Sequence, residues 1–224
     1  LFGPEHSQVL SALRASIADG STRLASGALQ SEAIFRTRPE LYKVGLAAPV
    51  LTLAKRYLGL DCYYLGASFK REAADGRACG TRQWHMDMED EKLFRVIVYL
   101  APVREDGGPF EYIAKPSSQE AKVYFRYRLG FLSDDCMRKL ASEDQWRPVY
   151  GEAGDAVLFD GAAVFHRTQP PTRADRYSIT LTYASRHPLE LQFSSRLSRR
   201  SRRRLLGQLT PEQQACVPPP VLLW

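Results

Sequence analysis

The sequence contains few cysteines and no long hydrophobic run, and both absences exclude whole classes of protein. The cysteines lie far apart and include no C-x-x-C pair, so we expect neither a zinc clamp nor a framework of disulfides. They are Cys62, Cys79, Cys136 and Cys216. We interpret them as reduced thiols and expect a cytoplasmic location. The longest apolar stretch, Val44–Ala54, is too short to span a membrane and contains Pro49, so we expect no membrane span.

The sequence also has little excess of one charge outside a single segment. Its 31 Lys and Arg residues exceed the 25 Asp and Glu residues by six, and six arginines fall in one short stretch without an acid. They are Arg196, Arg199, Arg200, Arg202, Arg203 and Arg204. The rest of the chain is therefore neutral. The stretch Arg196–Arg204 has no interleaved aromatic residues for base stacking, so we do not expect nucleic acid as a partner. It is either solvated or a contact for another anionic partner.

The apolar patterns that are present predict helices before strands. Apolar residues recur at helical spacing in Gln8–Ala18 and in Leu41–Leu58, the latter interrupted near Pro49. From Gly59 onward the runs are short, rich in β-branched and aromatic residues, and separated by Gly, Pro and Asp, as in strands. The predicted strands are Cys62–Phe69, Leu93–Leu100, Phe110–Ala114, Ala156–Phe159, Ala163–His166 and Tyr177–Ala184.

Many short strands after a helical lead-in predict a mainly β protein with flanking helices, an α+β class with a jelly-roll core. A length of 224 residues with 44% hydrophobic side chains fits a single domain. We expect Ser133 to cap a short helix at Asp134–Ala141, and Thr210-Pro211-Glu212-Gln213 to start a C-terminal helix. The expected parts are a helical lead-in at 1–58, the jelly-roll core at 59–187, and a basic segment with C-terminal helix and tail at 188–224.

Two histidines lie in strand-like segments, and one of them is close to a carboxylate. If the segment around His85 is extended, its side chain and that of Asp87 lie on the same face. His166 closes a later strand, which a jelly-roll can bring beside the first. Two imidazoles and one carboxylate on one side of a metal leave the other side open, which suits non-haem Fe(II) in oxygen chemistry. For the His-Asp pair alone, a buried structural hydrogen bond is the alternative.

Arg176 and Ser178 lie at the start of the last predicted strand and share a face by alternation. A guanidinium binds a carboxylate through two N–H groups, and a serine hydroxyl adds one donor. Beside a metal, this face is therefore suited to a dicarboxylate. A surface arginine on an edge strand is the alternative.

In chain order, these segments resemble those of the phytanoyl-CoA dioxygenase-like branch of the Fe(II)- and 2-oxoglutarate-dependent oxygenases. Members are similar in carrying a Trp-His-x-Asp strand, a Gly-Pro-Phe-x-x-Ile segment, a Gly-Asp-x-x-x-Phe strand, a distal His and a following Arg. The matching residues are Trp84–Asp87, Gly108–Ile113, Gly154–Phe159, His166 and Arg176. The resemblance covers residues 58–184 and departs from the family at 114–118, where Ala-Lys-Pro-Ser-Ser replaces the usual Pro-Gly-Ser-His.

The resemblance implies a double-stranded β-helix that binds Fe(II), with 2-oxoglutarate chelating the metal and molecular oxygen taking the last position. The implied metal ligands and catalytic residues are His85, Asp87 and His166. The far carboxylate of 2-oxoglutarate is implied to bind Arg176, with Ser178 on the same face and Thr168 matching a family Ser/Thr after the distal His. Related halogenases carry a small residue in place of this Asp, so hydroxylation with release of succinate and CO2 is expected rather than halogenation. Desaturation or cyclisation would look the same in sequence.

Lys70 and Tyr99 are further candidates for contact with substrate or cosubstrate. Lys70 ends the strand before the metal motif and is alternatively an exposed strand-end lysine. Tyr99 is alternatively part of the core. Glu89 shares the alternating face of Asp87, and we expect it to be solvated or to contact a metal ligand instead of the metal. The expected substrate is a small molecule or a group tethered to coenzyme A or a carrier protein, and the oligomeric state is not predicted.

Two other functions compete with the oxygenase. The first is a non-catalytic jelly-roll that binds an anionic partner through Arg196–Arg204. The second is a cupin-like metalloenzyme that uses no cosubstrate. Arg176 separates the second from the oxygenase, because only the oxygenase needs a cation for the far carboxylate of 2-oxoglutarate.

Overall fold

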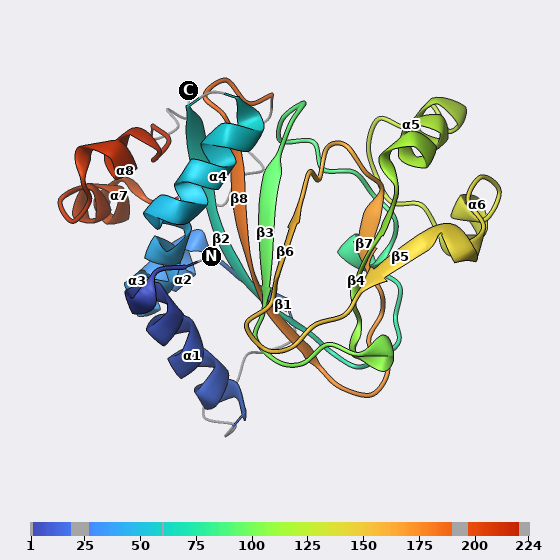
Figure 1. Ribbon diagram of the computed structural model, residues 1–224, viewed down its shortest axis with the longest axis horizontal. Helices are drawn as coiled ribbons and strands as arrows, with labels where there is room; N and C mark the ends of the chain where they lie inside the picture. The colour runs from blue at the N-terminus through green and yellow to red at the C-terminus, as the bar shows by residue number, and fades with distance from the viewer. Residues whose placement is uncertain (1, 19–26, 60, 190–196, 220–224) are drawn as a thin grey trace.

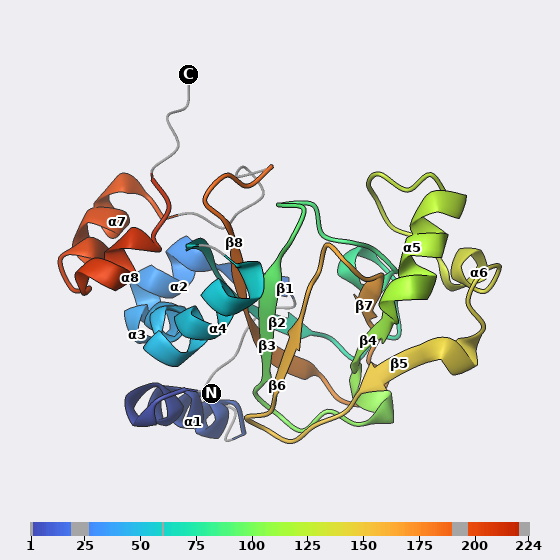
Figure 2. The ribbon, with the colours of Figure 1, turned by 45° about the horizontal axis from the view of Figure 1, so that its top comes forward.

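The computed structural model describes residues 2–18, 27–59, 61–189 and 197–219, and its strands form two antiparallel sheets (Figure 1). The larger sheet has the strand order β1-β2-β8-β3-β6, and the smaller has β5-β4-β7. The strands are β1 (Gly27–Gln30), β2 (Cys62–Glu72), β3 (Phe94–Tyr99), β4 (Phe110–Ile113), β5 (Trp146–Val149), β6 (Ala156–Phe159), β7 (His166–Thr168) and β8 (Arg176–Ser185). The sheets face each other as a jelly-roll (Figures 1 and 2), which confirms the predicted fold class.

Aromatic side chains join the two sheets. The ring of Phe110 on β4 lies with its centroid 4.4 Å from that of Phe159 on β6. The Tyr99 hydroxyl at the end of β3 donates a hydrogen bond to the Val149 carbonyl of β5 (2.7 Å) and accepts one from the Phe110 N–H (3.1 Å). Strands of both sheets are therefore held together next to the site described below.

Helices cover the outer face of the larger sheet (Figures 1 and 2). They are α1 (Pro4–Ala18), α2 (Ser31–Thr37), α3 (Pro39–Lys43) and α4 (Ala48–Leu58). Their buried residues, among them Leu13, Phe35 and Val50, pack with Tyr64 and Leu181 of the sheet in one hydrophobic core. No helix in the described ranges is long and apolar enough to cross a membrane.

The helix predicted over Leu41–Leu58 is interrupted near Pro49, as expected, and the break lies just before the proline. α3 runs into a 3-10 turn, η1 (Val44–Leu46), and α4 begins after Ala47, whose backbone is extended. Pro49 lies in the first turn of α4, where its missing N–H has no helical partner to lose. α4 ends at Leu58 and is capped by Gly59, whose positive φ of 78° gives the left-handed conformation that closes many helices.

The smaller sheet carries α5 (Lys115–Tyr124) and α6 (Asp134–Met137). Ser133 caps α6 as predicted, since its hydroxyl accepts a hydrogen bond from the Cys136 N–H (3.3 Å), but the helix is shorter than the expected Asp134–Ala141. Helix α5 is an addition to the sequence prediction. It begins in the segment 114–118 that departs from the family pattern, with Pro116 in its first turn.

The C-terminal helices α7 (Arg199–Leu206) and α8 (Pro211–Ala215) pack outside the N-terminal helices (Figure 1). The predicted capping box at Thr210 and Gln213 is confirmed, because each residue's side chain accepts a hydrogen bond from the other's backbone N–H. Arg196 of the basic stretch lies outside the described residues. The four cysteines form no disulfide. The remaining 3-10 helices are η2 (Gly80–Arg82), η3 (Glu105–Gly107) and η4 (Glu143–Gln145).

Candidate metal site and adjoining cavities

His85, Asp87 and His166 meet between the two sheets. Their potential ligand atoms all lie within 4.8 Å of one another. His85 follows η2, and its backbone N–H and carbonyl pair with the carbonyl and N–H of His166 on β7, at 3.0 and 2.9 Å. Nε2 of His166 lies 3.5 Å from Oδ2 of Asp87, and Nε2 of His85 lies 3.9 Å from Oδ1. The sequence prediction grouped these three residues, and the fold brings them together.

Backbone carbonyls orient both imidazoles. Nδ1 of His85 lies 2.9 Å from the Gln83 carbonyl, and Nδ1 of His166 lies 3.0 Å from the Val164 carbonyl. Because a carbonyl only accepts hydrogen bonds, Nδ1 carries the proton in each ring. The Nε2 lone pairs are then directed at the space beside Asp87, as a metal requires.

Burial and charge set the protonation of the three groups. Burial lowers the pKa of His85, and it lowers the pKa of His166 to about 3, so both imidazoles are neutral at neutral pH. Burial disfavours the ionised form of Asp87, but the positive charge of Arg95 outweighs it and lowers the pKa of Asp87. Neutral imidazoles and an ionised carboxylate are the forms that bind metals.

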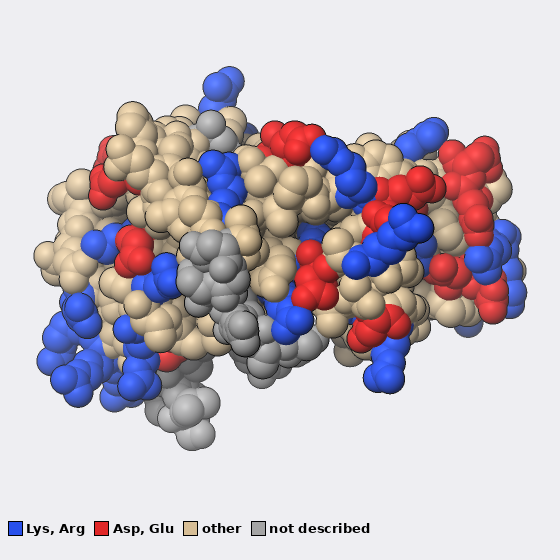
Figure 3. All heavy atoms as spheres, turned by 90° about the horizontal axis from the view of Figure 1, so that it is seen from below, with Lys and Arg blue, Asp and Glu red and all other residues tan. Residues whose placement is uncertain are grey.

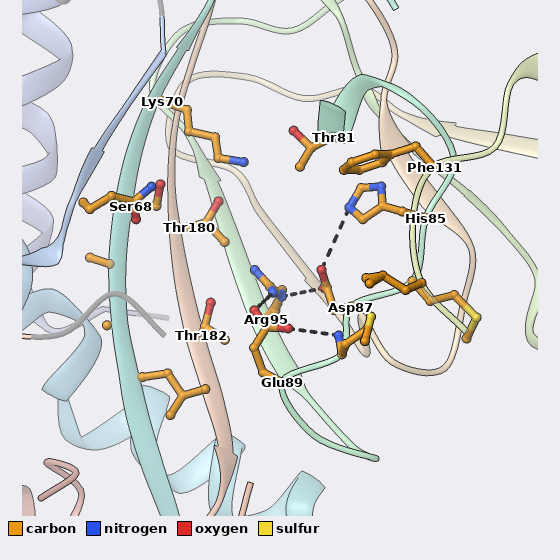
Figure 4. A pocket seen from close by; sticks show the side chains of 18 of the residues that line it. Ser68, Lys70, Thr81, His85, Asp87, Glu89, Arg95, Phe131, Thr180 and Thr182 are labelled. Atoms are coloured by element: carbon orange, nitrogen blue, oxygen red, sulfur yellow. Dashed lines mark hydrogen bonds and ion pairs between the residues drawn. The ribbon is translucent and has the colours of Figure 1, made fainter. Parts of the chain in front are cut away.

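Asp87 is held in place from two sides. Its backbone N–H donates to the Gly161 carbonyl (2.9 Å), and the space is so tight that a Cβ on Gly161 would overlap Oδ2. On the other side, Nε of Arg95 lies 2.6 Å from Oδ2, an ion pair without hydrogen-bond geometry. Arg95 also donates a hydrogen bond to Glu89 (Figure 4). Glu89 therefore contacts the arginine that pairs with Asp87, and it is not among the three grouped residues.

Arg176 and Ser178 line a small cavity of about 60 Å³ together with the three grouped residues. Arg176 is buried, its Nη1 donates to the Thr168 hydroxyl (2.8 Å), and its guanidinium lies 5.3 Å from the centroid of the Tyr99 ring. Nε of Arg176 and Oγ of Ser178 are buried without a hydrogen-bond partner among the described residues. Buried polar atoms are seldom left unpaired, so this cavity is suited to a polar ligand.

A second cavity of about 380 Å³ adjoins the first (Figure 4). Hydroxyl groups of Ser68, Thr180 and Thr182 on β2 and β8 line one side, and apolar side chains such as Phe131 line another. Lys70 lines both cavities, and burial lowers its pKa. Lys70 is therefore a cavity residue, whereas Tyr99 lines neither cavity and is fully buried.

The sequence prediction missed Arg95, which lines both cavities, and the row of hydroxyls on β2 and β8. Arg95 carried a usable signal, because it is the one charged residue in the apolar run 93–100. A charge in an otherwise buried strand needs a partner, and its nearest acids along the chain flank the metal motif. The hydroxyls carried no comparable signal, since Ser and Thr are common in strands.

The fold and the grouped residues together define a cupin-type jelly-roll with a candidate metal site, the architecture of the structures found by comparison. EctD from S. alaskensis with bound Fe shares 17% identity and matches 88% of this chain and 72% of its own, with a TM-score of 0.59. HygX from Streptomyces hygroscopicus with nickel and 2-oxoglutarate bound shares 12% identity and matches 83% and 80%, with a TM-score of 0.53. ThoJ, a non-heme monooxygenase in apo form, shares 16% identity and matches 84% and 72%, with a TM-score of 0.55.

These likenesses show the fold. No model of a known protein family matches the chain, and no curated protein matches it in sequence. The EctD structure has bound iron, the HygX structure has nickel and 2-oxoglutarate bound, and this chain has the His–Asp–His group in the same type of fold. The finer resemblance to phytanoyl-CoA dioxygenases stays a prediction.

Proposed function

We propose that the chain is an Fe(II)- and 2-oxoglutarate-dependent oxygenase that hydroxylates a carbon of a small molecule. The observation that carries the proposal is one cavity in which the His85, Asp87 and His166 ligand atoms adjoin Arg176, a buried arginine without a carboxylate partner in the described ranges. The donor types suit Fe(II) with an open side. The iron- and 2-oxoglutarate-bound structures of similar fold support the same assignment.

The residues of the smaller cavity fit a dicarboxylate. We assign one carboxylate of 2-oxoglutarate to Arg176, with the Ser178 hydroxyl as a further donor. Thr168 supports this contact because its hydroxyl accepts a hydrogen bond from Arg176. Lys70, which is half-buried, adds a second cation at the boundary of the two cavities. Fe(II) with 2-oxoglutarate and molecular oxygen supplies the oxidation of an unactivated carbon, with succinate and CO2 as co-products.

The larger cavity is assigned to the substrate. Its size fits a small molecule, and its hydroxyl-lined and apolar sides fit a ligand with both polar and apolar parts. HygX with hygromycin B and EctD with 5-hydroxyectoine hold small molecules, which favours a free small molecule over a carrier- or coenzyme-A-tethered group. Because Asp87 occupies the carboxylate position, we propose hydroxylation and not halogenation. We also propose that the chain belongs to the phytanoyl-CoA dioxygenase-like family and that it is located in the cytoplasm.

Anaerobic titration of the metal-free chain with Fe(II) and then 2-oxoglutarate tests the proposal. A 2-oxo acid bound to Fe(II) through two oxygens gives a visible charge-transfer band, which we expect in the wild type and not in Asp87→Ala. Arg176→Ala is expected to weaken 2-oxoglutarate binding about 30-fold, because the lost charge-assisted hydrogen bonds are worth about 2 kcal/mol. Arg173→Ala is the control, since this side chain is 83% exposed, and should bind like the wild type.

The competing functions give different results in this titration. Folded, iron-loaded wild type without the band contradicts the proposal and favours the metalloenzyme without cosubstrate. Folded protein that binds no iron favours the non-catalytic jelly-roll. If the band forms and Arg176→Ala keeps the wild-type affinity, the cosubstrate lies elsewhere in the cavity.

A further inference from the structure

Arg95 on β3, the strand between β8 and β6 in the larger sheet, contacts two carboxylates that belong to the same short segment. Its Nε lies 2.6 Å from Oδ2 of Asp87, and its Nη2 donates to Oε1 of Glu89 (2.6 Å). The guanidinium, drawn with both acids in Figure 4, lies between the two cavities. Oε2 of Glu89 accepts a hydrogen bond from the Met88 N–H (3.1 Å), so both oxygens of Glu89 are engaged.

Two carboxylates near one metal site create a difficulty for the proposed reaction. A metal with two histidines and one carboxylate oxygen keeps open positions on its other side, as oxygenase chemistry requires. Asp87 has a second oxygen, and Glu89 adds two more. Each of these oxygens is a good ligand for Fe(II), and each one bound would remove a position that 2-oxoglutarate or oxygen needs. Some group must keep them from the metal.

We propose that Arg95 is a positioning residue that limits Asp87 to one metal-binding oxygen and keeps the carboxylate of Glu89 away from the metal. The inference rests on the proposed function and deepens it. The guanidinium is suited to this role because its planar fork contacts two carboxylates at once. Its positive charge also weakens both carboxylates as additional ligands.

The experiment replaces Arg95 with methionine, which fills similar space without charge, and uses Co(II) as the probe of the metal site. Arg95→Met should bind Co(II) roughly tenfold more tightly than the wild type, because a nearby positive charge is lost and further carboxylate oxygens reach the metal. It should bind 2-oxoglutarate at least about tenfold more weakly and lose most of the Fe(II)–2-oxoglutarate band, because those oxygens occupy the open positions.

A double variant identifies the competing oxygens. In Arg95→Met with Glu89→Gln, the charge of Glu89 is gone, so Co(II) affinity and the band should return toward the wild type if Glu89 is the intruding ligand. The single variant Glu89→Gln leaves Arg95 on Asp87 and should keep the band. If Arg95→Met does not fold, Arg95→Lys serves in its place, since one ammonium can hold only one of the two acids and should give an intermediate loss of 2-oxoglutarate affinity.

Arg82→Met is the matched control. Arg82 is also buried between two acids, with Glu72 at 2.8 Å and Asp75 at 2.5 Å, but neither acid belongs to the metal group. A purely structural role of a buried arginine predicts lower thermal stability in both variants and unchanged metal and cosubstrate affinity. The change in affinities is therefore the readout that separates positioning from stability.

The outcomes separate this inference from the proposed function. Wild-type protein without the Fe(II)–2-oxoglutarate band overturns the proposed function itself. A normal wild-type band together with unchanged or weaker Co(II) binding and unchanged 2-oxoglutarate affinity in folded Arg95→Met overturns the role of Arg95 alone. Tighter Co(II), weaker 2-oxoglutarate and rescue by the double variant support it.

Discussion

At the scale of single residues, Gly161 limits where the Asp87 carboxylate can lie. A Cβ at this position would overlap Oδ2 and approach Cγ to 2.8 Å. Gly161→Ala should therefore turn the carboxylate away from the histidines. We expect Fe(II) affinity to fall about 10- to 100-fold, as it does when groups that orient a metal ligand are changed. Isothermal titration with Fe(II) under nitrogen measures the effect.

Gly107→Ala is the control for Gly161→Ala, because nothing lies within 4 Å of a Cβ added to Gly107. It should keep the wild-type affinity and melting temperature. If Gly161→Ala binds Fe(II) as tightly as Gly107→Ala, the carboxylate can move without cost, and its orientation is set by other groups.

The grouped residues could be predicted from sequence because their signals are local or come from the family resemblance. His85 and Asp87 share a face at two-residue spacing, and Arg176 and Ser178 do the same. The pairing of His166 with His85 depends on which strands are neighbours, and the resemblance supplied that. Arg95 was missed although it is the one charged residue in the apolar run 93–100, because the apolar pattern of the strand does not say which nearby acid its charge reaches.

At the scale of elements, strands with a strong apolar pattern were predicted well. Ala156–Phe159 has the expected bounds, and β8 extends its prediction, Tyr177–Ala184, by one residue at each end. β7 begins at the last residue of the predicted strand Ala163–His166 and continues to Thr168, because pairing with β4 begins only at His166. β1 was missed because its four residues show no alternation and are defined by pairing with β2. Strand pairing is non-local and leaves no mark in so short a segment.

Tyr99 joins three strands, and its hydroxyl is expected to matter for stability more than for binding. Tyr99→Phe removes both hydrogen bonds and leaves the buried Phe110 N–H without its partner. We expect a loss of about 1–3 kcal/mol in the free energy of unfolding. The ring that packs against Arg176 remains, so 2-oxoglutarate affinity should change less than about threefold. Urea unfolding and the anaerobic titration measure the two quantities.

Tyr150→Phe is the control for this change, because Tyr150 is 49% exposed. Its stability should match the wild type. If Tyr99→Phe is no less stable than Tyr150→Phe, the hydroxyl does not hold the strands together. If it loses 2-oxoglutarate binding at wild-type stability, Tyr99 belongs to the cosubstrate site after all.

At the scale of the whole molecule, the basic helix and the cavities lie on opposite sides of the larger sheet. α7 packs on α2, where Glu32 accepts hydrogen bonds from the Ser198 N–H (2.7 Å) and the Ser201 hydroxyl (2.9 Å). Figures 1 and 2 both show the larger sheet between α7 and the smaller sheet. In Figure 3, Lys and Arg side chains gather at the left end of the surface, the end where α7 and α8 lie in Figure 1. An anion bound there would not reach the cavities.

This separation predicts that charge on α7 and binding in the cavities are independent. The arginines of α7 that are exposed are Arg199, Arg200, Arg203 and Arg204. Changing all four to glutamine should leave Fe(II) and 2-oxoglutarate affinities within about twofold of the wild type, because solvent and salt screen charges beyond about 10 Å. The variant should elute from heparin at lower salt, since the local positive charge is removed. A large loss of 2-oxoglutarate affinity in the folded variant would contradict the separation and assign the helix to the active site. Unchanged heparin elution would show that α7 is not the anion-binding surface.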